Sequence, residues 1–213
     1  MAAQSPVRAV IPALNIIPRD TPPQLYASNL AHFSSISWAA ALLSQPSTIP
    51  YIPTCRNPAS PQHDQFFGVT IASDRGISHM LSFFTGTDAN TRDPDTPVKK
   101  VSTLYQLGHG LTGGPATLHG GITMAMVDEA MGAIPELNFA LGKNGAAFAN
   151  ISMTGLLEIK FLRPILTGNA VVATAWMEEV EGRKTRVRCE VRGENGEELA
   201  RCSSTWVSLR ANI

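Results

Sequence analysis

A glycine pair that leads into an apolar run with one carboxylate is the part of this sequence best suited to chemistry. Gly120 and Gly121 precede the run from Ile122, and Asp128 lies seven residues after Gly121. The first turn of a helix has backbone N–H groups without helical partners, and their partial positive charge suits a developing oxyanion. Glycines allow a substrate to approach this backbone closely. We therefore predict an active site on a helix that begins at the glycines.

The surroundings of Asp128 favour a catalytic carboxylate over a solvated one. Its neighbours at helical spacing are Met124, Val127 and Met131, so the side chain is expected to face largely apolar groups. Burial of a lone carboxylate is costly and raises its pKa, as in a general base. Glu129 lies about 100° further around the helix. We therefore predict that Glu129 is a solvated or inter-subunit carboxylate.

The stretch Leu118–Asp128 resembles the core motif of hotdog-fold thioesterases, in which His-Gly-Gly is followed by an acidic residue nine positions after the His. His119 and Asp128 are the matching residues. The resemblance covers about 66–209, where Met153-Thr154, Arg163-Pro164-Ile165 and 179–184 follow as in the acyl-CoA thioesterases called superfamily members four and five. It implies an α+β hotdog fold, with an antiparallel sheet wrapped around a long central helix.

The resemblance also implies roles for individual residues in acyl thioester hydrolysis. The N–H of Gly121, with that of Gly120, polarises the thioester carbonyl, and Asp128 activates water or attacks directly. His119 is expected to orient the loop. Thr154 matches a hydroxyl that comes from the opposite subunit and helps to hold the attacking water.

The same resemblance implies a homodimer or tetramer with shared active sites. Coenzyme A is expected as part of the substrate, with no separate cofactor. Arg163, Lys160 and the basic face of 183–192 are candidates for its phosphates, because arginine forks match phosphate oxygens. Some hotdog thioesterases carry Asn or Gln shortly before the glycines, where this chain has Gly113 and Gly114.

Two alternatives to hydrolysis share the same scaffold. One is a dehydratase or tailoring enzyme that acts on a polyketide-like intermediate, and the other is an acyl-binding protein without turnover. Hydratases of this fold pair the Asp with a later His on the helix, and no His follows Asp128 in this sequence. This absence favours hydrolysis.

The composition argues against several other classes of protein. Seventeen Lys and Arg balance seventeen Asp and Glu, so no basic field attracts nucleic acid. No apolar run is long enough to span a bilayer, and the five His and three Cys show no metal-ligand spacing. A serine-hydrolase elbow and a phosphate-binding loop are also absent. We expect a cytoplasmic protein. Arg8 and Arg19, without acids before Asp20, leave a mitochondrial transit segment as the alternative.

The pattern along the chain separates a proline-rich extension, 1–60, from a hotdog domain, 61–213. The extension is expected to contain one helix over about 24–43. Pro135 is expected to end the motif helix after Ile134. We predict a solvated loop over 88–96, and strands over 77–84, 101–107, 148–161, 169–180, 183–192 and 197–209.

A hairpin turn at Asn195-Gly196 sets the register of the last two strands. It places Cys189 opposite Cys202, and Glu190 opposite Arg201. Charge pairing supports this register, and we expect both cysteines to be reduced. Alternation of charged and apolar residues over 184–192 predicts one wet face and one buried face.

Overall fold

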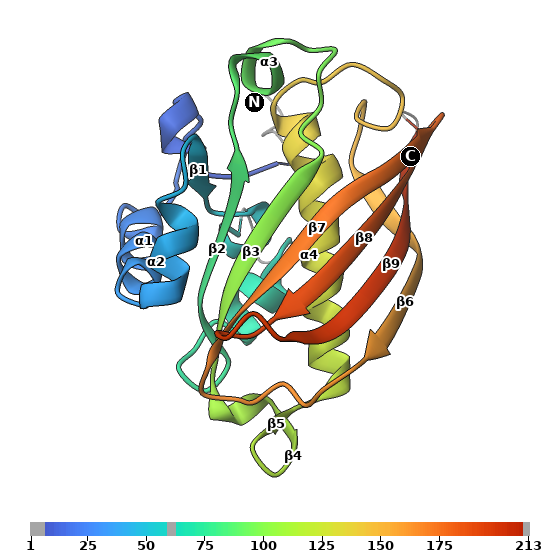
Figure 1. Cartoon of the computed structure of the whole chain (residues 1–213). Coiled ribbons are helices and arrows are strands. Elements are labelled where there is room, and N and C mark those ends of the chain that lie inside the picture. The colour runs from blue at the N-terminus through green and yellow to red at the C-terminus, as the bar shows by residue number, and fades with distance from the viewer. Residues whose placement is uncertain (1–6, 59–62, 211–213) are drawn as a thin grey trace.

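The computed structural model describes residues 7–58 and 63–210, and within these ranges seven strands form one antiparallel sheet that wraps around the long helix α4, Gly120–Ala140 (Figure 1). The strand order is β1-β2-β3-β7-β8-β9-β6. The strands are β1 (Thr48–Tyr51), β2 (Ile77–Thr85), β3 (Lys100–Leu107), β6 (Ser152–Phe161), β7 (Ala170–Glu181), β8 (Lys184–Arg192) and β9 (Glu198–Ser208). The six predicted strands are confirmed, and β6 lies at the sheet edge beside β9.

The inner face of the sheet and α4 form the main core. Tyr105 of β3 is fully buried and its hydroxyl donates a hydrogen bond to the Met126 carbonyl oxygen at 2.7 Å. Gly132 on α4 leaves room for the ring of Trp206, because a Cβ atom there would lie 2.6 Å from it. The helix is therefore held against the sheet at its middle, where Asp128 lies.

The predicted end of this helix after Ile134 is wrong, since α4 continues through Pro135 to Ala140. A proline inside a helix removes one hydrogen bond. The buried Asn138 offsets this loss, because its Nδ2 donates to the carbonyl oxygens of Ile134 and Val98, each at 2.9 Å. Its Oδ1 accepts from the Val98 N–H at 2.8 Å. These bonds tie the last turns of α4 to the chain that enters β3.

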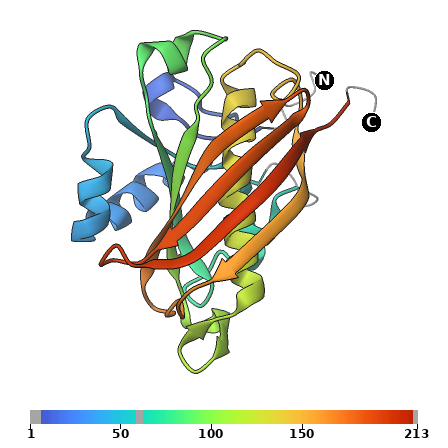
Figure 2. The ribbon, with the colours of Figure 1, turned by 45° about the vertical axis from the view of Figure 1, so that its right-hand side comes forward.

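The helical part of the N-terminal extension, residues 25–43, forms a layer on the opposite, outer face of the sheet (Figures 1 and 2), whereas Ala9, Ile11 and Cys55 join the main core with α4. The described part of this extension has two α-helices, α1 (Leu25–Ser34) and α2 (Ser37–Leu43), so the prediction of one helix is wrong. The break occurs where Ile36 is extended, with φ −97° and ψ 111°. Phe33 and Ala39 are fully buried in a cluster with Leu81, Leu104 and Val172 of β2, β3 and β7. The extension also supplies β1, the other edge of the sheet.

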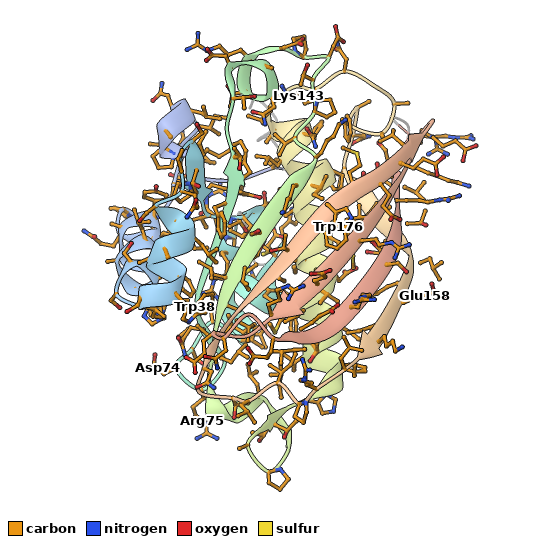
Figure 3. All side chains as sticks on the ribbon, viewed as in Figure 1. Trp38, Asp74, Arg75, Lys143, Glu158 and Trp176 are labelled. Atoms are coloured by element: carbon orange, nitrogen blue, oxygen red, sulfur yellow. The ribbon has the colours of Figure 1, made fainter. Side chains whose placement is uncertain are left out.

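Strands β7, β8 and β9 form the predicted meander. Cys189 is opposite Cys202 and Glu190 is opposite Arg201, as predicted, and all three cysteines are free. The turn is longer than the two residues predicted, because the Gly193 N–H bonds to the Glu197 carbonyl oxygen at 3.1 Å. Burial alternates along β8 as expected, and Trp176 of β7 is half-buried (Figure 3).

Short elements complete the fold. The predicted loop over 88–96 is exposed but contains a helical turn, α3 (Asp88–Arg92), which Thr87 and Asn90 cap reciprocally. The strands β4 (Thr112–Gly114) and β5 (Thr117–Leu118) form a hairpin just before α4. Single helical turns are found at Pro12–Leu14, Thr54–Arg56, Phe66–Thr70 and His109–Leu111.

Candidate active site

Asp128 and Thr154 form a hydrogen-bonded pair between α4 and β6. The Thr154 hydroxyl donates to Asp128 Oδ1 at 2.7 Å. The ladder between β6 and β9 shifts register between Thr154 and Leu156, and such a bulge re-aims the side chains beside it. Burial raises the pKa of the half-buried Asp128, and the hydrogen bond from Thr154 opposes this rise. Thr154 was expected from the opposite subunit, but the strand beside α4 brings it to Asp128 within one chain.

The N-terminus of α4 is capped by His119. Its Nδ1 accepts a hydrogen bond from the Gly121 N–H at 3.0 Å, so the neutral ring carries its proton on Nε2. The His119 carbonyl oxygen accepts from the N–H groups of Ile122 and Thr123 at 3.0 and 3.1 Å. The predicted donor Gly121 is therefore occupied. Within the described residues, the Gly120 N–H has no hydrogen-bond partner and is the open donor of this turn.

The open N–H and the carboxylate are far apart along the helix. Gly120 precedes Asp128 by eight residues, which corresponds to a rise of about 12 Å. A reacting carbonyl needs an oxyanion donor at roughly 3 Å and the attacking group on the same carbon. One chain therefore cannot present both groups to one carbonyl.

A cavity of about 380 Å³ adjoins the Asp128–Thr154 pair. It lies between α4, the start of β6, and residues on the opposite side that include Thr54, Cys55 and Asp64. Its lining combines apolar and polar side chains: Val7, Thr54, Cys55, His63, Asp64, Asp128, Glu129, Gly132, Pro135, Glu136, Phe139, Ile151, Ser152, Met153, Thr154 and Trp206. The carboxylate and its hydroxyl partner thus stand beside a space for a ligand.

Two acids that line this cavity were misjudged or missed. Glu129 was predicted to be solvated or inter-subunit, but it is half-buried and lines the same cavity as Asp128. Burial raises the pKa of Glu129 to about 7 and that of Glu136 to about 8. Their spacing of seven residues places them on one side of α4, two turns apart. This spacing is a signal that the sequence contained.

The candidate phosphate contacts lie at the other end of β6. Arg163 is exposed, and its Nη1 donates to the Glu198 carbonyl oxygen at 3.1 Å. Lys160 is exposed one residue before Phe161, whose ring is near Gly120. The basic face of β8 is largely neutralised, because Arg186 pairs with Glu179 at 3.1 Å and Arg188 with Glu178 at 2.6 Å. The structure therefore does not support β8 as a phosphate site.

Residues 7–58 and 63–210 contain no group of three or more His, Cys, Asp or Glu side chains arranged to hold a metal ion. In the same ranges, no helix is both long and apolar enough to cross a membrane.

A known protein family matches the part of the chain that carries this site. Residues 116–200, which include Gly120, Asp128 and Thr154, match the model of the thioesterase superfamily. This segment belongs to the thioesterase superfamily. The match and the antiparallel sheet around α4 together confirm the predicted hotdog fold.

Individual relatives are more distant. The chain is 27% identical over 165 residues to verlamelin biosynthesis protein B of Lecanicillium sp, covering 67% of this chain and 71% of that protein. It is 35% identical over 94 residues to the acyl-coenzyme A thioesterase THEM4 of Bos taurus, covering 44% of this chain and 34% of that protein. The chain thus spans about a third of the length of that thioesterase.

Two solved structures show partial similarity to this chain. The E. coli PaaI protein from the phenylacetic acid degradation operon superposes with a TM-score of 0.45 and 15% identity, over 52% of this chain and 73% of that chain. The thioesterase superfamily protein RHA08564 gives a TM-score of 0.41 and 21% identity, over 55% of this chain and 63% of that chain.

Proposed function

We propose that this protein hydrolyses acyl thioesters, with acyl-CoA as the substrate class and Asp128 as the general base. The observation that carries the proposal is the hydrogen bond between Thr154 and Asp128 beside a cavity, in a thioesterase-superfamily segment. The acyl-coenzyme A thioesterase among the relatives supports the choice of coenzyme A as the thiol.

The hydrogen bond suggests how the base acts. Thr154 holds Oδ1 of Asp128 and leaves Oδ2 to accept a proton from water. The water oxygen bonds to the thioester carbon, and the carbon–sulfur bond then breaks. The acyl group leaves as a carboxylic acid, and the proton on Asp128 passes to the departing thiolate. Atoms and charge balance without any further reactant.

The oxyanion donor in this proposal is the Gly120 N–H of a second chain. The edge strand β6 exposes large apolar side chains, with Met153 57%, Leu156 54% and Phe161 52% exposed. Met124 on α4, between Gly120 and Asp128, is 38% exposed. Exposed apolar patches with an open strand edge are typical of protein interfaces. Two copies joined antiparallel at this face would bring the start of one α4 toward the middle of the other.

One observation favours a second candidate function, hydration or dehydration of an acyl thioester. Such chemistry pairs an acid with an imidazole, and His63 lines the cavity with Asp128 although it precedes it in the sequence. The release of thiol separates the two functions, because dehydration leaves the thioester intact.

The test is thiol release from a panel of acyl-CoA thioesters, measured with a thiol reagent. We expect Asp128→Asn to lose nearly all activity, because the amide cannot accept the proton from water. Asp88→Asn is the matched control, since this carboxylate is 95% exposed on α3. An Asp128→Asn protein that hydrolyses acyl-CoA as fast as wild type would overturn the assignment. Loss of substrate without thiol would identify a dehydratase.

A further inference from the structure

The wall of the cavity beyond Asp128 carries several polar and charged side chains among apolar ones. Glu129 and Glu136 come from α4, and Thr54, Cys55 and Asp64 come from the segment across the cavity. Apolar side chains such as Met153 and Trp206 line it near Thr154. The cavity therefore offers an acyl chain apolar contact beside the reacting centre and hydrogen-bonding groups beyond it.

Near neutral pH, Glu136 and part of the Glu129 population can act as uncharged hydrogen-bonding groups. Burial is the largest cause of their raised pKa values, and neighbouring carboxylates add to it. A protonated carboxyl both donates and accepts hydrogen bonds. Glu129 interacts with the Cys55 thiol, and Glu136 interacts with the side chain and backbone of Thr54. Each carboxyl has more hydrogen-bonding capacity than one such neighbour uses, and both face the cavity.

We propose that this cavity binds the acyl group of the substrate and selects an acyl chain bearing a hydroxyl group, which exchanges hydrogen bonds with Glu129 and Glu136. The proposal rests on the proposed function, because it takes the Asp128–Thr154 pair as the point of thioester cleavage. It adds the substrate class, which neither the family match nor the relatives specify.

Physical reasons favour a hydroxylated chain over a plain or an anionic one. A plain alkyl chain displaces water from the two carboxyls and cannot replace the hydrogen bonds that the water made. This loss costs roughly 1–3 kcal/mol of binding free energy for each carboxyl left unsatisfied. A chain that ends in a carboxylate is repelled by Asp64 and by any ionised fraction of the glutamates. A hydroxyl both donates and accepts, so it meets either carboxyl without adding charge.

The dimensions of the cavity limit the chain. At roughly 30 Å³ for each water-sized group, a volume of 380 Å³ holds about a dozen heavy atoms. Glu136 follows Asp128 by eight residues, or about 12 Å along α4. Glu129 is adjacent to Asp128 in the sequence. A hydroxyl in the middle or outer part of a ten-carbon chain is therefore within the range that the two acids span.

The experiment compares decanoyl-CoA with its hydroxylated isomers, with hydroxyls placed at successive carbons, in the thiol-release assay. We expect at least one isomer to exceed decanoyl-CoA about tenfold to hundredfold in kcat/KM. Decanedioyl-CoA, which ends in a carboxylate, is expected to be poorer than decanoyl-CoA. Equal rates for all hydroxylated isomers and decanoyl-CoA, or a preference for aminodecanoyl-CoA, would overturn the proposal.

Variants of the two glutamates test whether these residues cause the preference for a hydroxylated chain. Glu136→Leu is expected to abolish or reverse the preference for the hydroxylated chain, whereas Glu136→Gln, which still donates and accepts, keeps most of it. The wild-type substrate series needs no variant, so the proposal stays testable if Glu136→Leu fails to fold. A preference unchanged in folded Glu129→Leu and Glu136→Leu would assign it to other residues and refute the proposal.

A binding measurement separates this inference from the proposed function. Asp128→Asn is titrated by calorimetry with decanoyl-CoA and with the hydroxylated isomers. If wild type releases no thiol while this variant binds a hydroxylated chain more tightly than decanoyl-CoA, the proposed hydrolysis is wrong and the proposed preference of the cavity for a hydroxylated chain is supported. If wild type hydrolyses every thioester without preference and the variant binds all of them equally, the proposed hydrolysis is supported and the proposed preference for a hydroxylated chain is wrong.

Discussion

Activity restored by mixing two inactive variants is the sharpest consequence of the separation of about 12 Å between Gly120 and Asp128 along α4. The first variant is Gly120→Pro, which removes only the open N–H. Proline is well tolerated at the first position of a helix. His119 already has φ −63° and ψ 132°, a conformation that suits a residue before proline. The second variant is Asp128→Asn, which keeps the size of the side chain and an acceptor for Thr154.

The expected recovery follows from counting sites. Each variant alone lacks one essential group in both sites of a symmetric dimer, and loss of one oxyanion donor typically costs ~10²–10³ in turnover. In a mixed dimer, one site receives Asp128 from one chain and the Gly120 N–H from the other, while the second site lacks both. Random pairing makes half of the dimers mixed. An equal mixture should therefore show about a quarter of the wild-type rate.

The assay uses two affinity tags, so that mixed dimers are purified by successive capture and their thiol release is measured. Purified mixed dimers should have about half of the wild-type rate. Gly120→Ala is the matched control, because it keeps the N–H and its Cβ atom would lie 3.5 Å from the Phe161 ring, an ordinary contact. Verified mixed dimers as inactive as the parent variants would refute a site that is shared in this way. Full activity of Gly120→Pro alone would refute the donor.

Three further predictions concern the pH dependence and the β6 edge. Thr154→Val removes the hydrogen bond that lowers the pKa of Asp128, so the acid limb of the kcat/KM profile should move to higher pH. Thr154→Ser keeps the hydroxyl and should leave this limb in place. An acid limb that does not move in the valine variant would contradict the pairing of Thr154 with Asp128. Glu136 has a pKa of about 8 in the fold against 4.5 ordinarily, so the folded state binds the extra proton and the free energy of unfolding should fall as pH rises from 4.5 to 8. Glu136→Gln should flatten this fall, which thermal melts at pH 5 and pH 8.5 would reveal as a smaller change in Tm. Leu156→Arg on β6 should yield monomers by light scattering and little activity, while Val180→Arg, at a site 45% exposed on β7, should change neither.

Much of the scaffold is readable from the sequence because its patterns are local. The strict alternation over 184–192 reflects one wet and one buried face, and the glycine pair marks the start of α4. The break at Ile36 and the continuation through Pro135 were mispredicted. The latter depends on Asn138 and its bonds to Val98, forty residues away in the chain, which periodicity cannot show.

The site was harder to predict from the sequence than the fold, for a related reason. Asp128 stood out by its apolar neighbours, and the resemblance supplied Thr154, but only the adjacent strand shows that the two meet within one chain. Helix α4 is buried on most sides, so its residue pattern does not distinguish a side that faces core from one that faces a cavity. Glu129 was misplaced for that reason. The choice between Gly120 and Gly121 depends on the direction of one imidazole ring.

The α1–α2 layer has a consequence for how large an assembly this chain can build. The sheets of two neighbouring molecules can stack only where the outer face of each sheet is not covered by other elements. Here the apolar part of that surface, over β2, β3 and β7, is already occupied by Phe33, Ala39 and their neighbours from the same chain. The adjoining part, over β7 and β8, carries paired charges that resist desolvation. We therefore expect the extension to prevent back-to-back stacking of two sheets, so that self-association is expected at the β6 edge.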